Sequence, residues 1–128
     1  MSSGRHADSH RLRRAAEFRG VREVGGRGWS TPLLVMYVAP NDLGLVRYGI
    51  TVSGRVGKAV VRNRVRRRLR EAMRMRLRHL LSGRDVVLVA RPAAAEATWS
   101  QLCAALDSLL RRGGMLLPGA TETTAACV

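Results

Sequence analysis

One segment, residues 57–81, places the strongest constraint on how this chain can fold. Within it, apolar side chains recur every three or four positions, which is the spacing of one face of an α-helix. The members of this stripe are Val61, Val65, Leu69, Ala72 or Met73, Leu77 and Leu80. Ser82-Gly83 follows and supplies the glycine that commonly ends a helix. The pattern therefore predicts a long helix that packs one stripe against a core.

The rest of this helix surface carries positive charge. Between Arg55 and Arg78 the chain has eleven basic residues and one acid, Glu71, which we expect to form an ion pair within the helix. Four arginines follow one another at four-residue intervals, Arg62, Arg66, Arg70 and Arg74. Five more are expected to widen this exposed face, Arg64, Arg67, Arg68, Arg76 and Arg78. Solvated helix faces usually mix both signs of charge, so a face of one sign favours phosphate binding.

The charge of the whole chain points the same way. Twenty-three Lys and Arg against nine Asp and Glu give a formal net charge of +14. A polyanionic partner would relieve the resulting self-repulsion, and nucleic acid would also release condensed counterions. An anionic membrane surface is the competing partner. The sequence disfavours it, because the basic residues are not paired with a face rich in Trp, Phe and Leu.

The remaining periodic segments predict an α+β fold in one domain of the 128-residue chain. The expected order is α-β-β-α-β-α, with a helix at 11–24, strands at 33–39 and 46–52, the long helix, a strand at 86–90 and a helix at 96–112. Turn residues 41–44 leave a short connection that favours an antiparallel hairpin between the first two strands. The wholly apolar run at 86–90 predicts a central strand buried on both faces. One small sheet with helices packed on it satisfies these elements.

The termini and the cysteines add little chemistry. Residues 1–10 are expected to be flexible and residues 118–128 to be disordered. No apolar run approaches the ~20 residues of a membrane span, and no signal peptide is recognised. Cys103 lies among apolar residues and is expected to be buried, whereas Cys127 lies in the tail. These features predict a cytoplasmic, reduced protein.

No catalytic residue or metal site is predicted for the protein itself. Hydrolysis of a phosphodiester needs metal-binding carboxylates or a general base near the phosphate. The nine acids are scattered along the chain, and the three histidines, His6, His10 and His79, do not join them in any recognisable constellation. The expected mode of action is therefore binding.

The stretch GKAVVRNRVRRRLRE, residues 57–71, closely resembles the signature of the bacterial ribonuclease P protein family, with Arg62-Asn63-Arg64 at the family's Arg-Asn-Arg triplet. Residues 47–53 resemble the family's second strand, and residues 88–92 resemble its third strand and exit. Leu12-Arg13-Arg14 followed by Glu17-Phe18 is similar to its opening. The resemblance extends over residues 11–117, which we take as the RNA-binding domain.

This resemblance implies an α-β sandwich whose helix crossover is left-handed, where the general rule would predict a right-handed one. It implies a subunit of the ribonucleoprotein endonuclease that removes the 5′ leader from precursor tRNA. In that enzyme the RNA subunit would hold Mg²⁺ and carry out the cleavage, and the protein would bind no cofactor of its own. The implied partners are the catalytic RNA and the leader, with neither a membrane nor a small-molecule substrate.

The resemblance also assigns residues to two binding surfaces. The positions implied to face the catalytic RNA are Arg55, Lys58, Arg62, Asn63, Arg64, Arg66, Arg67 and Arg70. The positions implied to line the leader cleft are Phe18, Arg22, Tyr37 and Arg91. Arg22 stands where the family often has a second aromatic, and its guanidinium can stack on a base instead. Met36 takes the place of Tyr37 if the strand register shifts by one residue.

Some alternatives stay open from the residues alone. Asn63 is equally compatible with an RNA contact and with a local cap or turn near the helix start. A ribosomal or ribosome-assembly protein would share the basic charge without needing a leader cleft. A nucleoid DNA-binding protein would need a dimer or a helix-turn-helix neighbour, which the sequence does not show. A protein-only ribonuclease is disfavoured by the scattered carboxylates.

Overall fold

A computed structural model describes residues 27–41 and 43–117 as a four-stranded sheet with two α-helices, which confirms the predicted α+β class. The strands are β1 (Arg27–Ser30), β2 (Leu34–Pro40), β3 (Val46–Val52) and β4 (Arg84–Ala90). The helices are α3 (Ala59–Arg76) and α4 (Trp99–Arg112), with short 3₁₀ turns η1 (Gly54–Val56), η2 (Leu77–His79) and η3 (Pro92–Glu96). The predicted helix at 11–24 and the predicted terminal segments, 1–10 and 118–128, lie outside the described residues.

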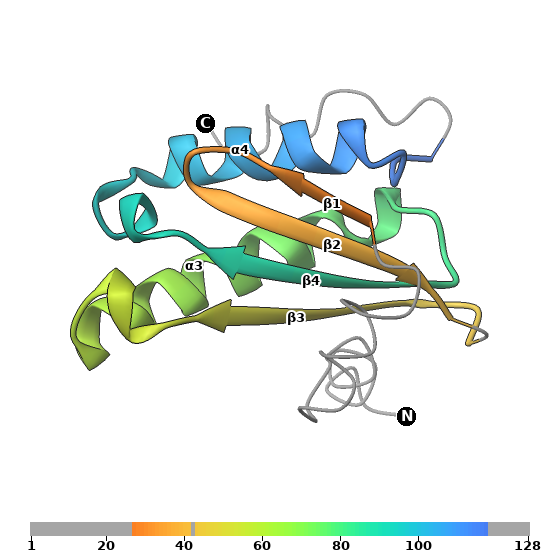
Figure 1. Ribbon diagram of the computed structural model, residues 1–128. Helices are drawn as coiled ribbons and strands as arrows, with labels where there is room; N and C mark the ends of the chain where they lie inside the picture. The colour runs from red at the N-terminus through yellow and green to blue at the C-terminus, as the bar shows by residue number, and fades with distance from the viewer. Residues whose placement is uncertain (1–26, 42, 118–128) are drawn as a thin grey trace.

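The strand order is β1-β2-β4-β3, with β4 antiparallel to β2 and parallel to β3 (Figure 1). The predicted hairpin between 33–39 and 46–52 is therefore wrong, because β4 lies between β2 and β3 and pairs with both. β4 is the strand whose burial on both faces was predicted, and Val86, Val87 and Leu88 are all at most 1% exposed. A central position is what buries both faces of such a strand. α3 becomes the crossover between parallel strands, and its left-handedness stays a prediction.

β1 is an additional strand that the sequence pattern did not predict, because Gly25, Gly26 and Gly28 suggested only a break. It pairs antiparallel with β2, so that Gly28 stands opposite Tyr37. A Cβ on Gly28 would lie only 3.1 Å from Tyr37 Cε1. Glycine is therefore needed at this position because any larger residue would crowd the tyrosine ring.

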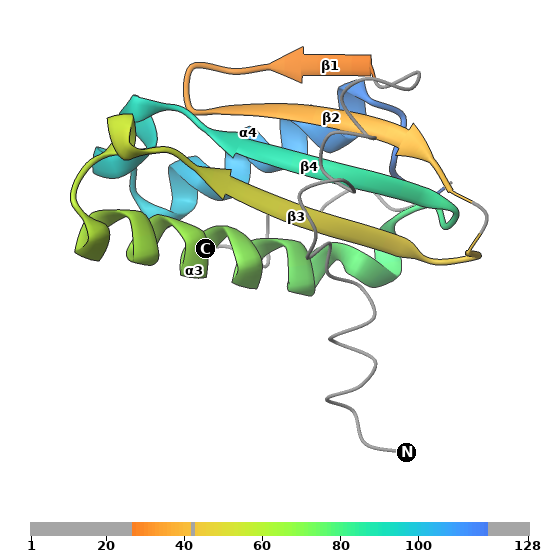
Figure 2. The ribbon, with the colours of Figure 1, turned by 60° about the horizontal axis from the view of Figure 1, so that its bottom comes forward.

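Both described helices pack on the same face of the sheet (Figures 1 and 2). Val65 and Leu69 of α3 and Leu102 and Leu106 of α4 are each at most 1% exposed, in one core with the inward side chains of the strands, such as Met36. The apolar stripe predicted for the long helix is thus confirmed as a buried surface at Val65 and Leu69, and α4 buries a stripe of its own. The opposite side of the sheet, called the far face below, carries the alternate residues of each strand.

The helix ends explain the small differences from the predicted bounds. α4 begins at Trp99 rather than Glu96, because Thr98 and Gln101 form a capping box. The hydroxyl of Thr98 accepts from Gln101 N at 3.1 Å, and Gln101 Oε1 accepts from Thr98 N at 2.9 Å. Gly113 follows the last helical residue, as predicted, and Cys103 is fully buried, as predicted.

Candidate nucleic-acid interface

The approach to α3 is shaped by a short turn and one glycine. Ser53 caps η1, and its Oγ accepts from Arg55 N at 3.4 Å. Gly57 then has φ +152°, and a Cβ there would lie 3.2 Å from Val61 Cβ. Any larger residue would push against the first turn of α3. Glycine at position 57 therefore lets the chain turn directly into α3. Arg55 and Lys58, on either side of this turn, are exposed at the protein surface.

The first turn of α3 is unusually positive. Lys58 stands at the N-cap without a side-chain cap bond, and no acidic residue lies in the first turn. The helix dipole adds partial positive charge at this end. Acidic residues stabilise a helix at this position, and without them this start offers backbone N–H groups and cations to an outside anion.

Several of the predicted RNA-facing cations have no partner in the described part of the chain. The side chains of Arg55, Lys58 and Arg67 are exposed, and that of Arg62 is half-buried. None of the four makes a hydrogen bond or ion pair within residues 27–41 and 43–117. Arg62 Nε is also buried without an acceptor there. These guanidinium and ammonium groups are therefore available to a ligand.

Two other arginines of α3 are fastened to the neighbouring η3 segment. Arg64 Nη2 donates to Ala95 O at 3.0 Å, and Arg68 Nη1 donates to Ala97 O at 3.2 Å. Both side chains are half-buried, so Arg68 is not simply part of the exposed face that the pattern predicted. These bonds hold the middle of α3 against the segment that follows β4.

Asn63 lies within α3 and does not cap its start, where Lys58 stands at the N-cap, and its RNA contact stays a prediction. Its Oδ1 accepts from Arg66 Nη1 at 2.8 Å, one helical turn further on. The amide thus orients an arginine and keeps its own N–H groups exposed. The predicted ion pair of Glu71 is confirmed, since Arg74 Nη2 lies 2.8 Å from Glu71 Oε1.

The prediction that Arg76 lies on the exposed basic face is wrong. Arg76 is fully buried, and its Nε donates to Asp107 Oδ1 of α4 at 2.6 Å. Its Nη2 donates to Asp107 Oδ2 at 3.1 Å, and its Nη1 to Ala72 O at 2.9 Å. A buried guanidinium requires such a carboxylate partner and satisfied donors.

A sequence signal for this buried pair exists. Arg76 follows Leu69 by seven residues, which places it on the apolar stripe of α3. Asp107 stands four residues after Cys103 and three before Leu110, so it lies on the apolar stripe of α4. Opposite charges on two facing stripes would have indicated a buried ion pair.

The second predicted surface, the leader cleft, is described only in part. Phe18 and Arg22 lie outside the described residues. Met36 is fully buried on the helix side of the sheet, so Tyr37 is the side chain on the far face. Tyr37 is half-buried beside Ala39, Val87 and Val89, in a small apolar cluster.

Arg91, the other predicted cleft residue, lies just beyond the end of β4. Its side chain is exposed, and its backbone N–H donates to Leu33 O at 2.9 Å. This bond fixes the exit of β4 beside the entry to β2. The structure thus places Arg91 at one end of the sheet and Tyr37 within it, without bringing the two side chains together.

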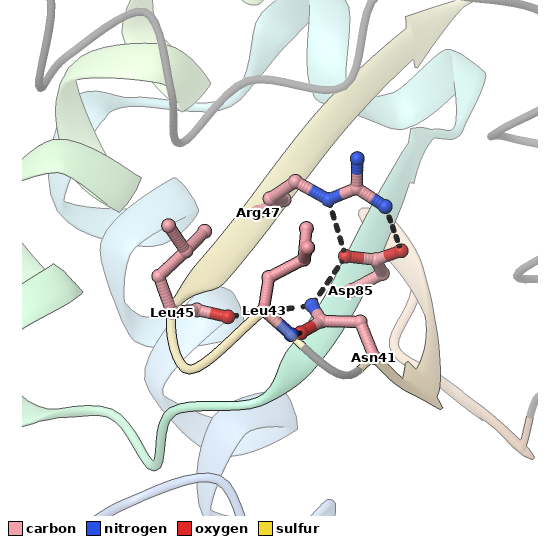
Figure 3. A network of polar contacts seen from close by, with 5 residues as sticks. All are labelled: Asn41, Leu43, Leu45, Arg47 and Asp85. Atoms are coloured by element: carbon pink, nitrogen blue, oxygen red, sulfur yellow. Dashed lines mark hydrogen bonds and ion pairs between the residues drawn. The ribbon is translucent and has the colours of Figure 1, made fainter.

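A polar network at the other end of the far face was not predicted (Figure 3). Arg47 of β3 donates from Nε and Nη2 to both oxygens of Asp85 of β4, at 2.9 and 2.7 Å. Asn41 Nδ2 donates to Asp85 Oδ1 at 2.7 Å and to Leu45 O at 3.3 Å. The parallel register places Arg47 opposite Asp85, and only that register could have revealed the pair.

Residues 27–41 and 43–117 provide neither a metal-binding cluster nor a helix that could span a membrane. Three or more His, Cys, Asp or Glu side chains nowhere gather in this part of the chain so as to hold a metal ion. No helix there combines the length and the apolar character that a bilayer span requires.

Comparison with known proteins identifies the family. The model of the family described as Ribonuclease P matches residues 7–114. The ribonuclease P protein component of Roseiflexus castenholzii is 41% identical over 116 residues, covering 90% of this chain and 94% of that protein. The protein of the same name from Chloroflexus aurantiacus is 44% identical over 121 residues, covering 94% of this chain and 88% of that one.

Solved structures agree with this assignment. A Staphylococcus aureus RNase P protein mutant with defective mRNA degradation activity superposes with a TM-score of 0.82 at 27% identity, covering 88% of this chain and 95% of that one. The RNase P protein from Thermotoga maritima, in complex with 1-(4-fluorophenyl)-2-thiourea, gives 0.73 at 28% identity, covering 79% and 97%. From sequence and fold together, the chain belongs to the ribonuclease P protein family.

Proposed function

We propose that this chain binds the catalytic RNA of ribonuclease P with the start of α3, and the 5′ leader of precursor tRNA with the far face of the sheet. Its relatives are named as protein components of ribonuclease P, which supports a place in that ribonucleoprotein. The observation that carries the RNA-binding proposal is the set of exposed cations at the start of α3, which lack acceptors within the described fold.

The RNA surface in this proposal consists of the positions that the family motif implies. Arg55, Lys58, Arg62 and Arg67 bind phosphates directly, because the described fold gives them nothing else to bind. Arg66 binds in an orientation set by Asn63. Arg64 and Arg70 complete the surface. One N–H group of Arg64 donates to Ala95 O, and its other donors remain for the RNA.

The leader surface rests on fewer described residues. Tyr37 supplies an aromatic ring for base stacking, and Arg91 supplies a cation at the end of the sheet where β4 stops. An aromatic ring and a cation suit a single strand, because stacking tolerates any base and the charge follows the backbone. Phe18 and Arg22 belong to the same proposal through the family motif.

In this proposal the RNA subunit holds the catalytic Mg²⁺ and cleaves the phosphodiester. Three of the four carboxylates in the described residues are already bound to arginines, Glu71 to Arg74, Asp85 to Arg47 and Asp107 to Arg76, and the fourth, Glu96, is exposed. The protein acts by screening phosphate repulsion between two RNAs in the cytoplasm. It thereby lowers the Mg²⁺ concentration that the RNA needs.

The test is cleavage of precursor tRNA by a bacterial ribonuclease P RNA at low, near-physiological Mg²⁺, with and without this protein. We expect cleavage only when the protein is added. The same RNA at high Mg²⁺ without protein serves as the positive control. If the RNA is active at high Mg²⁺ and the protein gives no rescue at low Mg²⁺, the proposed function is wrong.

A second measurement separates the two surfaces. Tyr37→Ala is expected to raise the KM for precursor tRNA while leaving the Kd for the catalytic RNA unchanged. Arg62→Ala is expected to weaken binding of the catalytic RNA instead. Equal damage to the same step by both substitutions would contradict the division into two surfaces.

A further inference from the structure

A pocket of about 440 Å³ lies where the end of β2, the start of β4 and the end of α4 meet. Its lining residues are Trp29, Val38, Ala39, Pro40, Arg84, Arg112, Gly113 and Gly114. It lies away from the start of α3, and it shares Ala39 with the apolar cluster beside Tyr37. Arg84 pairs with Val46 at the beginning of β3, whereas the start of α3 follows Val52 at the other end of that strand.

The charge of this pocket is one-sided. Arg84 and Arg112 come from two different elements, and no carboxylate is among the lining residues. The side chain of Arg84 makes no hydrogen bond or ion pair within the described part of the chain. Arg112 Nη1 donates to Ser30 O at 2.9 Å, which orients its guanidinium and leaves its other donors for a ligand. Two cations without a counterion favour an anionic ligand.

The rest of the lining is aromatic and apolar. Trp29, Val38 and Pro40 form this part, and Trp29 is half-buried. Gly113 packs so closely here that a Cβ on it would lie 3.5 Å from Trp29 Cε3 and 2.7 Å from Met36 Cε. An apolar wall beside two guanidinium groups suits a ligand with both a flat ring and a phosphate.

The carbonyls at the end of α4 do not repel such a ligand strongly, because the chain caps them. Gly113 N donates to Leu109 O at 2.8 Å, and Gly114 N donates to Arg111 O at 3.1 Å. Met115 N donates to Leu110 O at 2.9 Å. These hydrogen bonds satisfy carbonyls at the negative end of the helix dipole, and Arg112 in the last turn adds positive charge beside it.

We propose that this pocket binds one nucleotide of an RNA strand, with the phosphate between Arg84 and Arg112 and the base against Trp29. The inference rests on the proposed RNA-binding function and extends it to a third contact, beyond the start of α3 and the far face. The protein would then contact RNA at both ends of the sheet.

The experiment uses the fluorescence of Trp29 in the full-length chain. The chain has two tryptophans, so Trp99→Phe leaves Trp29 as the single reporter. This protein is titrated with a five-nucleotide oligouridylate and, separately, with inorganic phosphate. Anisotropy of a fluorescein-labelled copy of the oligonucleotide measures total binding. Arg84→Gln is the test variant, and Arg111→Gln, an exposed arginine outside the pocket, removes the same charge as its control.

We expect the oligonucleotide to change the emission of Trp29, and inorganic phosphate at the same concentration to leave it unchanged. Arg84→Gln should raise the Kd about three- to tenfold, as expected for one lost charge-assisted contact. It should also reduce the salt slope of binding by about 0.7, the value for one phosphate contact to a single strand. Arg111→Gln should stay within about twofold of the parent.

Three results would overturn the proposal. The first is an unchanged Trp29 emission at concentrations where anisotropy shows that the oligonucleotide is bound. The second is an equal Kd for the parent and Arg84→Gln. The third is an equal response to inorganic phosphate, which would make the pocket a small-anion site. Rescue of cleavage at low Mg²⁺ by the wild-type protein, together with any of these, would leave the proposed function standing and reject only the pocket.

Discussion

The two ends of α3 place the same residue type in opposite environments. In its first half, Arg62 and Arg67 have no side-chain partner in the described fold, and the helix N-terminus at Lys58 has no side-chain cap. At its end, Arg76 is fully buried and bound by Asp107 of α4. The difference comes from what packs alongside, because α4 faces the second end with a carboxylate. One end of the helix is therefore open to a ligand, and the other is tied to the core.

The largest effect on stability is expected from removing the buried ion pair at the end of α3. Arg76→Ala removes the guanidinium that pairs with the buried carboxylate of Asp107, which should lower the free energy of unfolding by about 3–5 kcal/mol. Urea unfolding followed by circular dichroism measures this. Arg78→Ala, an exposed arginine two residues on, is the control and should cost at most about 0.5 kcal/mol. Equal costs for the two variants would mean that burial does not distinguish these arginines.

The same pair sharpens the comparison when both charges are removed. Replacing Arg76 by Met together with Asp107 by Leu leaves no uncompensated charge, so the double variant should recover most of the lost stability. A double variant as unstable as Arg76→Ala alone would show that packing, rather than charge, holds the two helices here.

Substitutions in the first half of α3 should change the affinity for RNA and leave the stability of the fold unchanged. Replacing Arg62 and Arg67 together by Ala should weaken binding to ribonuclease P RNA about 10- to 100-fold and reduce the salt slope by about 2. Thermal unfolding should change little. Replacing Arg78 and Arg111 together removes the same charge elsewhere and is the matched control. A control double that loses as much affinity would indicate a general effect of net charge.

An intermediate effect is expected at the network of the far face. Asp85→Ala removes the acceptor of Arg47 and Asn41 together, and the side chain of Asp85 is only 10% exposed. We expect a loss of about 1–2 kcal/mol in the free energy of unfolding, because Arg47 regains water on the partly exposed side. Urea unfolding is again the measurement. A loss as large as that of Arg76→Ala would mean that this network is as dry as the helix pair.

The smallest effect is expected at the exposed ion pair of α3. Glu71→Gln breaks its contact with Arg74, whose side chain is 61% exposed, and should change the free energy of unfolding by no more than about 0.5 kcal/mol. The substitution also removes the only acid of the basic face, so RNA affinity should rise slightly at low salt. A large stability loss would contradict the assignment of this pair to the solvated surface.

Much of the candidate site could be predicted because it depends on local order. The order of cations along residues 55–70 and the Arg-Asn-Arg motif are sequence features, and the helix that carries them follows from its apolar period. Their contacts could not be predicted in the same way. Arg64 donates to Ala95 O and Arg68 to Ala97 O, about thirty residues further along the chain. The local periodicity of α3 carries no information about such distant contacts.

The sequence by itself determined where the two described helices run, which stripes they bury, that 86–90 is a doubly buried strand, and that the chain is strongly basic. These follow from periodicity and composition, which are properties of neighbouring residues. Only the tertiary structure decided that β4 separates β2 from β3, that β1 forms at all, and that Arg76 turns inward to Asp107. Each of these depends on contacts between residues far apart in the chain, where the gain from burial and charge pairing outweighs the local preference.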